Sequence, residues 1–381
     1  MLLLLTFIER RTMPKVLKVL SIVLVLYALV AGLLIPLKSG ITEVSPRRLE
    51  TGEPGRLTVT TYNAGLSEAK AFRAWLRIGR PAGEGERDTL LAAQRMERVG
   101  QQQLAIDFDL PRYLPTSQAS ADASLIVDLG SGAFVQPAAV ALTEPPGLSG
   151  PRSSAGWDDS FGELSVAQGW TFPFRGILYE TIRNTYYHVS LWFALMFIMA
   201  GAAIQAVRYL VTKQERFDRR SRALTEVGLI FGLLGLVTGM VWAKYTWGAA
   251  WSGDVKQNMT AIALLIYGAY FLLLASVRSP EMAARLLAAY NIFAFMMLIP
   301  LLYIIPRMQE SLHPGAGGNP GFGGEDLDNT MRAVFYPAIL GFTLLGYWMA
   351  ELSWRAKRVR SLVMERLYTP RSKRPEVANV A

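Results

Sequence analysis

The 381-residue sequence predicts a polytopic α-helical membrane protein with six transmembrane helices and an all-β domain inserted between helices one and two. Hydrophobic residues make up 51% of the chain and charged residues only 18%, whereas soluble domains carry about 25% charged residues. Six stretches are apolar for about 20 residues each, the length that crosses the hydrocarbon core of a bilayer. A long segment between the first two stretches is rich in turn residues and short alternating runs, which indicates β structure.

The six apolar stretches define the helices in chain order. The first is too long and too apolar for a signal peptide and has no cleavage site after it, so it is expected to remain as an anchor. Met1 and Met13 are both candidate start sites. The expected spans are residues 16–37, 189–211, 224–243, 259–277, 286–305 and 331–352, within an N-terminal part at 1–37, a membrane core at 188–352 and a basic tail at 353–381.

Basic residues predict the orientation of these helices. They precede the first span and then gather at 213–222, at 278–285 and at 355–374, and all four clusters fall on one side if the spans alternate. Lys and Arg accumulate in short cytoplasmic segments, so both termini are expected in the cytoplasm. The net charge of +9 is explained by this topology, and a nucleic-acid partner is not expected.

The segment at 38–145 is expected outside the cytoplasm and has a different character. Alternation of apolar and polar residues suits a sheet with one buried face, and an immunoglobulin-like sandwich is the predicted fold. A stretch at 146–187, rich in Pro, Gly and Ser at its start, is expected to link this domain to the membrane core. The expected strands are 57–62, 72–78, 103–110, 124–129 and 134–142.

The composition restricts the chemistry to very few side chains. The chain has no cysteine, which excludes disulfides, iron–sulfur clusters and thiolate zinc sites, and its two histidines are His188 and His313. The topology places both at the external face of the membrane. One interfacial histidine alone is typical of a solvated or capping residue, but two on one face favour a shared role. Two neutral imidazoles on opposite sides of a cavity commonly hold a haem iron.

An aromatic segment at 242–258 lies between the two histidines in the chain. It is predicted as an external loop that contains Trp242, Trp247 and Trp251. It has two open interpretations, an interfacial aromatic belt or a platform for a flat ligand. On the platform interpretation Asp254, Lys244 and Lys256 address the polar edge of the ligand. The glycine-rich external loop at 306–330 is likewise either a lid beside His313 or a flexible connector.

The run 235–254 resembles the tryptophan-rich signature of the haem-handling proteins of cytochrome c biogenesis, which reads W-G-x-x-W-x-W-D. That family places one histidine before this signature and one after it, as His188 and His313 stand here. Gly253 departs from the pattern where a tryptophan is expected, and Ala250 departs where an aromatic is common. Six helices point to the CcmC branch, whose simplest members lack the β domain. The residues that match the signature are Trp247, Gly248, Trp251 and Asp254.

The resemblance implies a haem carrier without catalytic residues or enzymatic activity. Haem b would be bound transiently at the external face of a bacterial inner membrane, with His188 and His313 as axial iron ligands, and delivered to the periplasmic chaperone CcmE. The implied partners are CcmA, CcmB, CcmD and membrane lipid, and ATP use belongs to a partner because no Walker motif is present. The implied haem-contacting residues are His188, His313, Trp242, Trp247, Gly248, Trp251 and Asp254.

Three other functions remain open from the sequence. A CcsA-like cytochrome c synthase component would attach haem itself, but such proteins carry more helices and histidines. A haem-independent assembly protein would act through its β domain and use the membrane part as an anchor. A transporter would carry haem across the bilayer.

Overall fold

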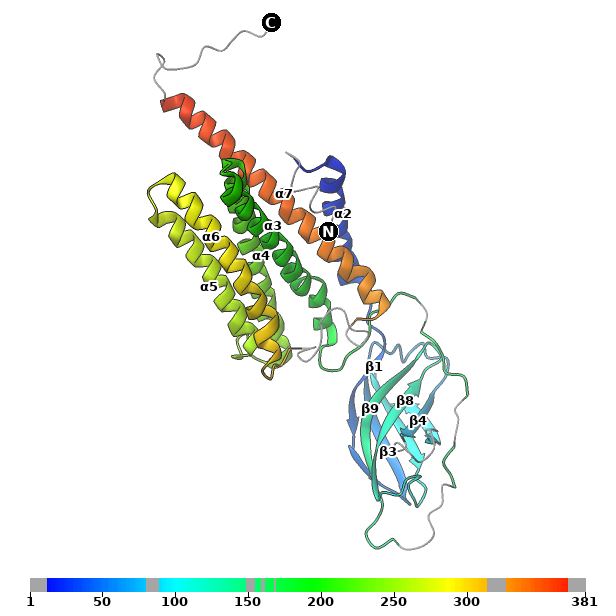
Figure 1. The fold of residues 1–381 in the computed structure, drawn as a ribbon. Helices are drawn as coiled ribbons and strands as arrows, with labels where there is room; N and C mark the ends of the chain where they lie inside the picture. Colours follow the sequence, from blue (N-terminus) through cyan, green and yellow to red (C-terminus); the bar gives the residue numbers. More distant parts are fainter. Residues whose placement is uncertain are drawn as a thin grey trace. The chain divides into compact units, whose positions relative to one another are not determined.

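The computed structural model describes residues 12–79, 89–148, 155–158, 162–167, 169–313 and 327–368. The chain divides into two compact units, with boundaries after Leu34 and after Glu180. The segment Ile35–Glu180 forms the β unit, and the remaining residues form the membrane unit (Figure 1). The two units are described separately.

The β unit contains two sheets built from short strands. Over the described residues, one sheet has four strands and the other has five. Neighbouring strands pair antiparallel except β2 and β9, which are parallel. The first sheet has the order β1 (Gly40–Ser45), β3 (Pro54–Tyr62), β7 (Gln103–Asp109), β6 (Arg95–Arg98), and the second has the order β2 (Arg48–Glu50), β9 (Ala133–Thr143), β8 (Ser120–Asp128), β4 (Arg73–Ile78), β5 (Thr89–Ala92).

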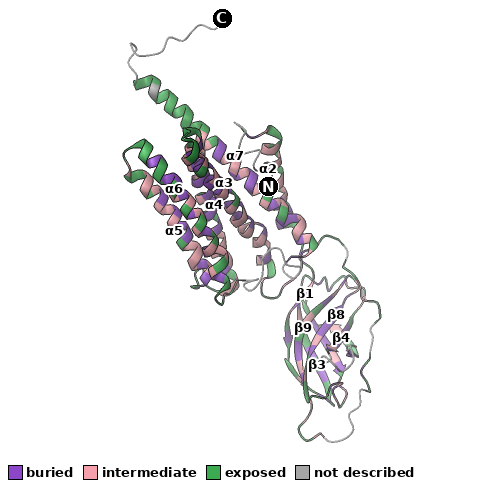
Figure 2. Ribbon diagram, in the orientation of Figure 1, coloured by how far each residue is buried: buried purple, intermediate pink, exposed green. Residues whose placement is uncertain are grey.

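Alternating side chains build the core of this unit. In β3 and β4 every second residue is buried, because successive side chains of a strand point to opposite faces. Leu57 and Leu104 from the first sheet and Leu76 and Leu125 from the second are fully buried in one cluster, so the two sheets share a core. Figure 2 shows buried stretches along the strands of this unit. All five strands expected from the sequence are confirmed. The short strands β1, β2, β5 and β6 were not expected.

Part of the segment at 146–187, expected to link the β domain to the membrane core, packs within the β unit. Trp157 is buried in the core of the β unit. Phe172 is fully buried and pairs with Leu37 through an isolated β-bridge. These buried side chains attach the segment after β9 to the two sheets, and the unit therefore extends to Glu180.

The membrane unit confirms the six expected spans. Its described residues form six helices that are long and apolar enough to cross a membrane. Most of them run several residues beyond the expected limits, because polar flanking residues continue the helical hydrogen bonding. The helices are α2 (Lys15–Leu34), α3 (His188–Thr212) preceded by the 3₁₀ turn η1 (Tyr179–Tyr186), α4 (Glu215–Trp247), α5 (Val255–Ser276), α6 (Pro280–Ile299) continued by η2 (Pro300–Ile304) and η3 (Ile305–Arg307), and α7 (Asn329–Tyr368).

Helix α3 lies at the centre of the membrane unit, against α4, α6 and α7. Glycines allow the helices to approach closely, as is common between membrane helices. Gly201 packs under the Tyr347 hydroxyl, Gly228 under Met199, and Gly346 under Ile198. The buried positions lie on the inner faces of the helices, while much of α2 is exposed and contacts α7 (Figure 2).

Buried polar side chains join the helices away from the histidines. Asn291 of α6 is fully buried and donates from Nδ2 to the hydroxyl oxygens of Ser221 (2.9 Å) and Thr225 (2.7 Å), both on α4. Each of these three residues therefore has a partner within the bundle. The cluster acts as a structural tie between α4 and α6, because interhelical hydrogen bonds stabilise membrane bundles.

Two acidic residues tie α7 to its neighbours. Glu226 of α4 accepts from Lys357 and from Ser353, both on α7. Glu351 was not anticipated, although it is the more buried of the two, with 1% of its side chain exposed. It accepts from Lys18 of α2 at 3.0 Å.

Candidate functional site

His188 is the first residue of α3 and packs on the face of α4. Its Nδ1 lies 2.8 Å from the Gly235 carbonyl oxygen. A Cβ at Gly239, one turn further along α4, would lie 2.6 Å from Cε1 of the ring. The imidazole therefore fits against α4 because residue 239 has no side chain. Trp192 packs edge-on to the same ring, with 6.3 Å between the centroids.

His313 lies in the segment that follows α6, against the end of α4. Its ring centroid is 5.9 Å from Trp242 and 4.9 Å from Trp247, and these two indoles are 4.9 Å apart. The three rings thus contact one another pairwise. Trp242 follows Gly239 by three residues, which is about 4.5 Å along the axis of α4. Both histidines therefore contact the same end of α4.

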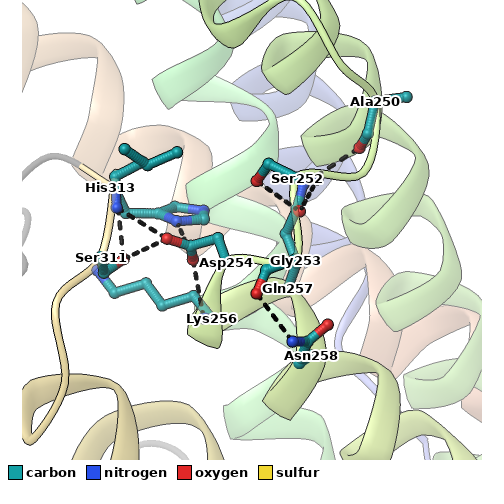
Figure 3. A network of polar contacts seen from close by, with 10 residues as sticks. Ala250, Ser252, Gly253, Asp254, Lys256, Gln257, Asn258, Ser311 and His313 are labelled. Carbon is teal, nitrogen blue, oxygen red and sulfur yellow. Dashed lines mark hydrogen bonds and ion pairs between the residues drawn. The ribbon is translucent and has the colours of Figure 1, made fainter.

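Asp254 anchors His313 through its carboxylate. Its Oδ1 accepts from Nδ1 of His313 at 2.8 Å and from the Lys256 amide at 2.8 Å (Figure 3). Its Oδ2 accepts from the Ser311 hydroxyl at 2.9 Å and from the Leu312 amide at 2.8 Å. Asp254 is also the N-cap of α5, a position that aspartate stabilises by about 1 kcal/mol. One buried side chain thus fixes both the start of α5 and the segment that carries His313.

The charge states at this anchor follow from burial and hydrogen bonding. Burial alone would raise the pKa of the Asp254 carboxyl, but the Leu312 amide, His313 and Ser311 hold that pKa below its ordinary value. Burial lowers the pKa of His313 to about 4, although the carboxylate of Asp254 acts in the opposite direction. At neutral pH the site therefore holds an aspartate anion and a neutral imidazole.

Both histidines present Nε2 as a lone-pair donor. A neutral imidazole carries one hydrogen, and its other nitrogen is an acceptor or a metal ligand. The Gly235 carbonyl and the Asp254 carboxylate can only accept, so each keeps the hydrogen on the Nδ1 that it faces. This orientation of ligating histidines by an outer partner is typical of metal sites. Each residue therefore carries its lone pair on Nε2, the ring nitrogen that would ligate a metal.

Among the described residues, no group of three or more His, Cys, Asp or Glu side chains is placed to hold a bare metal ion. A structural zinc site usually has four such ligands. Two imidazoles beside indole rings suit a flat macrocycle whose ring nitrogens already bind its metal.

The aromatic segment differs from its predicted form. Helix α4 continues to Trp247 and α5 begins at Val255, so the connecting loop is 248–254 rather than the whole of 242–258. Gly248 ends α4 in the left-handed conformation (φ 82°), as helices commonly end. Trp242 and Trp247 are therefore helix residues, and their spacing is set by α4.

The remaining predicted residues lie at the edge of the site. Trp251 is in the loop with 41% of its surface exposed, and the structure gives no ring contact between it and either histidine. Lys244 donates to the Gly248 carbonyl at 3.0 Å. Gly253, where the family signature has tryptophan, has a φ of 76°. A tryptophan at this position would carry the cost of about 1–2 kcal/mol that side chains incur in the left-handed region.

Two residues that sequence reasoning missed hold this loop in place. Gln257 accepts from the Ser252 amide at 2.9 Å and donates to the Ala250 carbonyl at 3.1 Å. Asn258 donates to the Gly253 carbonyl at 2.9 Å (Figure 3). An aspartate followed three residues later by glutamine is a helix-start pattern, and it could have indicated this role. The segment at 306–330, expected as either a lid or a flexible connector, lies outside the described residues from 314 to 326.

The fold and the site together define a class of protein. It is a multi-pass membrane protein in which two neutral histidines pack against the C-terminal part of α4 and contact tryptophans there. A sequence model of the CcmC family, described as Heme exporter protein C, matches residues 173–370. The chain belongs to this family. The match covers the membrane unit from just before η1 and leaves nearly all of the β unit outside it.

Individual relatives agree with this assignment. The chain is 27% identical over 188 residues to Heme exporter protein C of Bradyrhizobium diazoefficiens, covering 48% of this chain and 71% of the relative. It is 26% identical over 206 residues to Heme exporter protein C of Escherichia coli strain K12, covering 53% of this chain and 81% of the relative. A putative cytochrome c biosynthesis ccmC-like mitochondrial protein of Marchantia polymorpha is 30% identical over 145 residues, covering 38% of this chain and 60% of the relative.

Proposed function

We propose that this protein binds haem b transiently between His188 and His313 and delivers it to a periplasmic haem chaperone of the CcmE type for cytochrome c maturation. The observation that carries the proposal is the shared orientation of the two imidazoles, each with Nδ1 turned to an acceptor and Nε2 left for iron. Membership of the Heme exporter protein C family supports it independently.

The aromatic rings give the site the properties that a carrier needs. Trp242 and Trp247 are partly buried and offer apolar faces to the macrocycle, which gains most of its binding free energy from leaving water. Trp251 and Tyr245 are exposed, at 41% and 78%, and would form a rim that a receiving protein can reach. Histidine–iron bonds exchange, whereas thioether bonds would trap the haem. We therefore assign no catalytic residue and no enzymatic activity to this chain.

Orientation in a bacterial inner membrane follows from the basic segments. The basic segment 213–222 begins between α3 and α4 and continues into α4. The basic segment 278–285 begins between α5 and α6 and continues into α6, and α7 ends in a further basic run. With alternating spans, these segments and both termini would lie on one side, and the excess of Lys and Arg supports a cytoplasmic location for that side. His188, His313 and the β unit then belong to the periplasmic side.

The β unit is proposed to have an immunoglobulin-like fold. Labelled in chain order as A, A′, B, C, C′, D, E, F and G, its strands form the sheets A–B–E–D and A′–G–F–C–C′. The pairing of B with E and of F with both G and C is that of immunoglobulin domains. We propose that this unit recruits assembly partners, while the membrane unit contacts lipid and the CcmA, CcmB and CcmD subunits, with ATP consumed by the partners.

Haem occupancy of histidine variants tests the proposed function. Purified wild-type chain should carry or take up haem, and His188→Gly or His313→Gly should bind it more weakly, so that less haem is retained on purification while added haem still binds. Added imidazole should restore binding to each glycine variant, because it can fill the vacated position, and this rescue separates lost ligation from misfolding. Haem loading of the chaperone should fall with the occupancy of each variant.

Two outcomes would favour the alternatives. Unchanged haem occupancy and chaperone loading in the double variant His188→Ala, His313→Ala would remove the histidines from haem handling and leave the β unit as the functional part. Covalent attachment of haem to apocytochrome by the purified chain, without a chaperone, would make it a synthase component.

A further inference from the structure

The two histidines of the site are held by chemically different partners. Nδ1 of His313 donates to an ionised carboxylate, that of Asp254, at 2.8 Å. Nδ1 of His188 donates to a neutral amide carbonyl, that of Gly235, also at 2.8 Å, with the Thr238 hydroxyl 3.3 Å away. The hydrogen-bond lengths are equal, so the difference between the two rings is the charge on the acceptor.

This charge makes the two imidazoles unequal as ligands. A hydrogen bond to a carboxylate is roughly twice as strong as one between neutral groups and draws the Nδ1 proton away from the ring. The ring then gains imidazolate character, and its Nε2 donates more strongly to a metal. Three other donors share the Asp254 carboxylate, which reduces its negative charge but leaves it an anion.

The anchoring of the rings adds to this difference. Asp254 has 1% of its side chain exposed and is held by the N-terminus of α5 and by the 311–312 segment, so it cannot swing away from His313. His313 is further enclosed by Trp242 and Trp247. His188 packs on the backbone of α4 at Gly239, beside the Thr238 hydroxyl and edge-on to Trp192, and its hydrogen-bond acceptor is neutral.

We infer that His313 stays bound to the iron during haem transfer and that His188 dissociates first. Asp254 is the positioning residue that makes His313 the stronger ligand. The inference rests on the proposed haem site. During transfer the bond between iron and Nε2 of His188 breaks first, and its electron pair stays on that nitrogen. A ligand atom of the receiving protein then donates an electron pair to the vacated position, and no electron is gained or lost by the iron.

Carbon monoxide is the probe that tests this order. It binds ferrous haem by displacing the weaker axial ligand and reports on the remaining trans ligand through the Fe–C and C–O stretching bands. The full-length protein loaded with haem should give a single CO adduct. The adduct of His188→Ala should have the wild-type frequencies, because His313 is trans to CO in both, whereas the adduct of His313→Ala should differ.

Asp254→Asn tests the positioning role. Asparagine keeps the N-cap and an oxygen for His313 but removes the charge, so the Fe–C stretch should move to higher frequency. Ser311→Ala is the matched control, because it removes one hydrogen bond to the same carboxylate and keeps its charge. Thr238→Val is the corresponding change beside His188. Ser311→Ala should move the band slightly in the opposite direction, because one fewer donor shares the carboxylate charge, and Thr238→Val should leave it unchanged.

Each contrary result has a distinct meaning. If the adduct of His313→Ala matches wild type and that of His188→Ala does not, the order is reversed and the inference is wrong. A mixture of two wild-type adducts, or an Asp254→Asn band at the wild-type position, would also overturn it. Failure of the wild-type chain to bind haem would instead overturn the proposed function.

Discussion

At the scale of single residues, the geometry of the site depends on side chains that are absent as much as on those that are present. Gly239 admits the ring of His188, and Gly248 ends α4 directly after Trp247. Asp254 then links the loop, α5 and His313 through four hydrogen bonds. The position of each imidazole is therefore determined by contacts that a single substitution can remove.

Gly239→Ala should displace His188. The added Cβ would lie 2.6 Å from Cε1 of the ring, closer than carbon atoms approach without a shift. We expect haem affinity to fall about tenfold, which corresponds to roughly 1.4 kcal/mol. Gly268→Ala in α5 is the matched control, because a Cβ there meets no atom within 4 Å. Equal haem affinities for the two variants would show that contact with Gly239 does not position His188.

The His313–Asp254 pair should make the haem-free protein less stable in mild acid. Burial lowers the pKa of His313 to about 4, whereas an unfolded chain would titrate near 6.5. Between these values the unfolded chain binds more protons than the folded protein, so stability falls as the pH is lowered from about 6.5 to 4. The lowered pKa of Asp254 acts in the same direction at still lower pH.

Melting temperatures of wild type and His313→Gln, measured without haem between pH 7 and pH 4.5, check this expectation. The variant should lose less on acidification than wild type, because glutamine does not titrate. Identical slopes would show that the folded protein does not resist protonation of His313.

At the scale of elements, a helix or a sheet places each part of the site. Helix α4 presents Gly235, Gly239 and Trp242 at a spacing of four and three residues, which puts them on one face. The start of α5 holds the loop through Gln257 and Asn258. In the β unit, Trp157 from the segment after β9 packs into the core that the strands form.

Truncating two tryptophans of the β unit should change its stability by very different amounts. Trp157 is 7% exposed and packs in the core, so Trp157→Ala should destabilise the unit by about 3–5 kcal/mol. Trp170 is 61% exposed, and Trp170→Ala should change stability by less than about 0.5 kcal/mol. Chemical unfolding of residues 35–180 expressed alone measures both values. Equal effects would mean that the segment after β9 does not belong to the core.

At the scale of the whole molecule, each unit has its own core, and the family match follows the membrane unit. Within that unit the buried carboxylate of Glu351 joins α2 to α7, since it accepts from Lys18 and from the Met13 amide. Removing one partner of a buried ion pair leaves the other uncompensated, which is costly.

Glu351→Gln should therefore destabilise the membrane unit by several kcal/mol, of the order of 3. Glu226→Gln is the control, because Glu226 is 28% exposed and exposed ion pairs contribute less than about 1 kcal/mol. Thermal unfolding in detergent micelles compares the two variants. A smaller effect for Glu351→Gln than for Glu226→Gln would contradict the proposed tie between α2 and α7.

Sequence patterns predicted some features of this molecule and not others, for physical reasons. Hydropathy predicted the six helices, because each span must be apolar over its whole length. Strands such as β3 were predicted from alternation, whereas β2, with three residues, is too short to show a period. The end of α4 was placed too early, although Gly248 is a helix stop signal. The contact between Asp254 and His313 joins residues 59 apart and depends on the path after α6, which no local pattern encodes.

The absorption spectrum of ferric haem titrated into the purified protein tests the central claim most directly. Two neutral imidazoles on one iron predict a six-coordinate low-spin spectrum that saturates at one haem per chain. Replacing either His188 or His313 by glycine should convert it to a high-spin spectrum, and imidazole should restore the low-spin form. A wild-type spectrum that is high-spin, or that is unchanged when both histidines are replaced, would contradict the account.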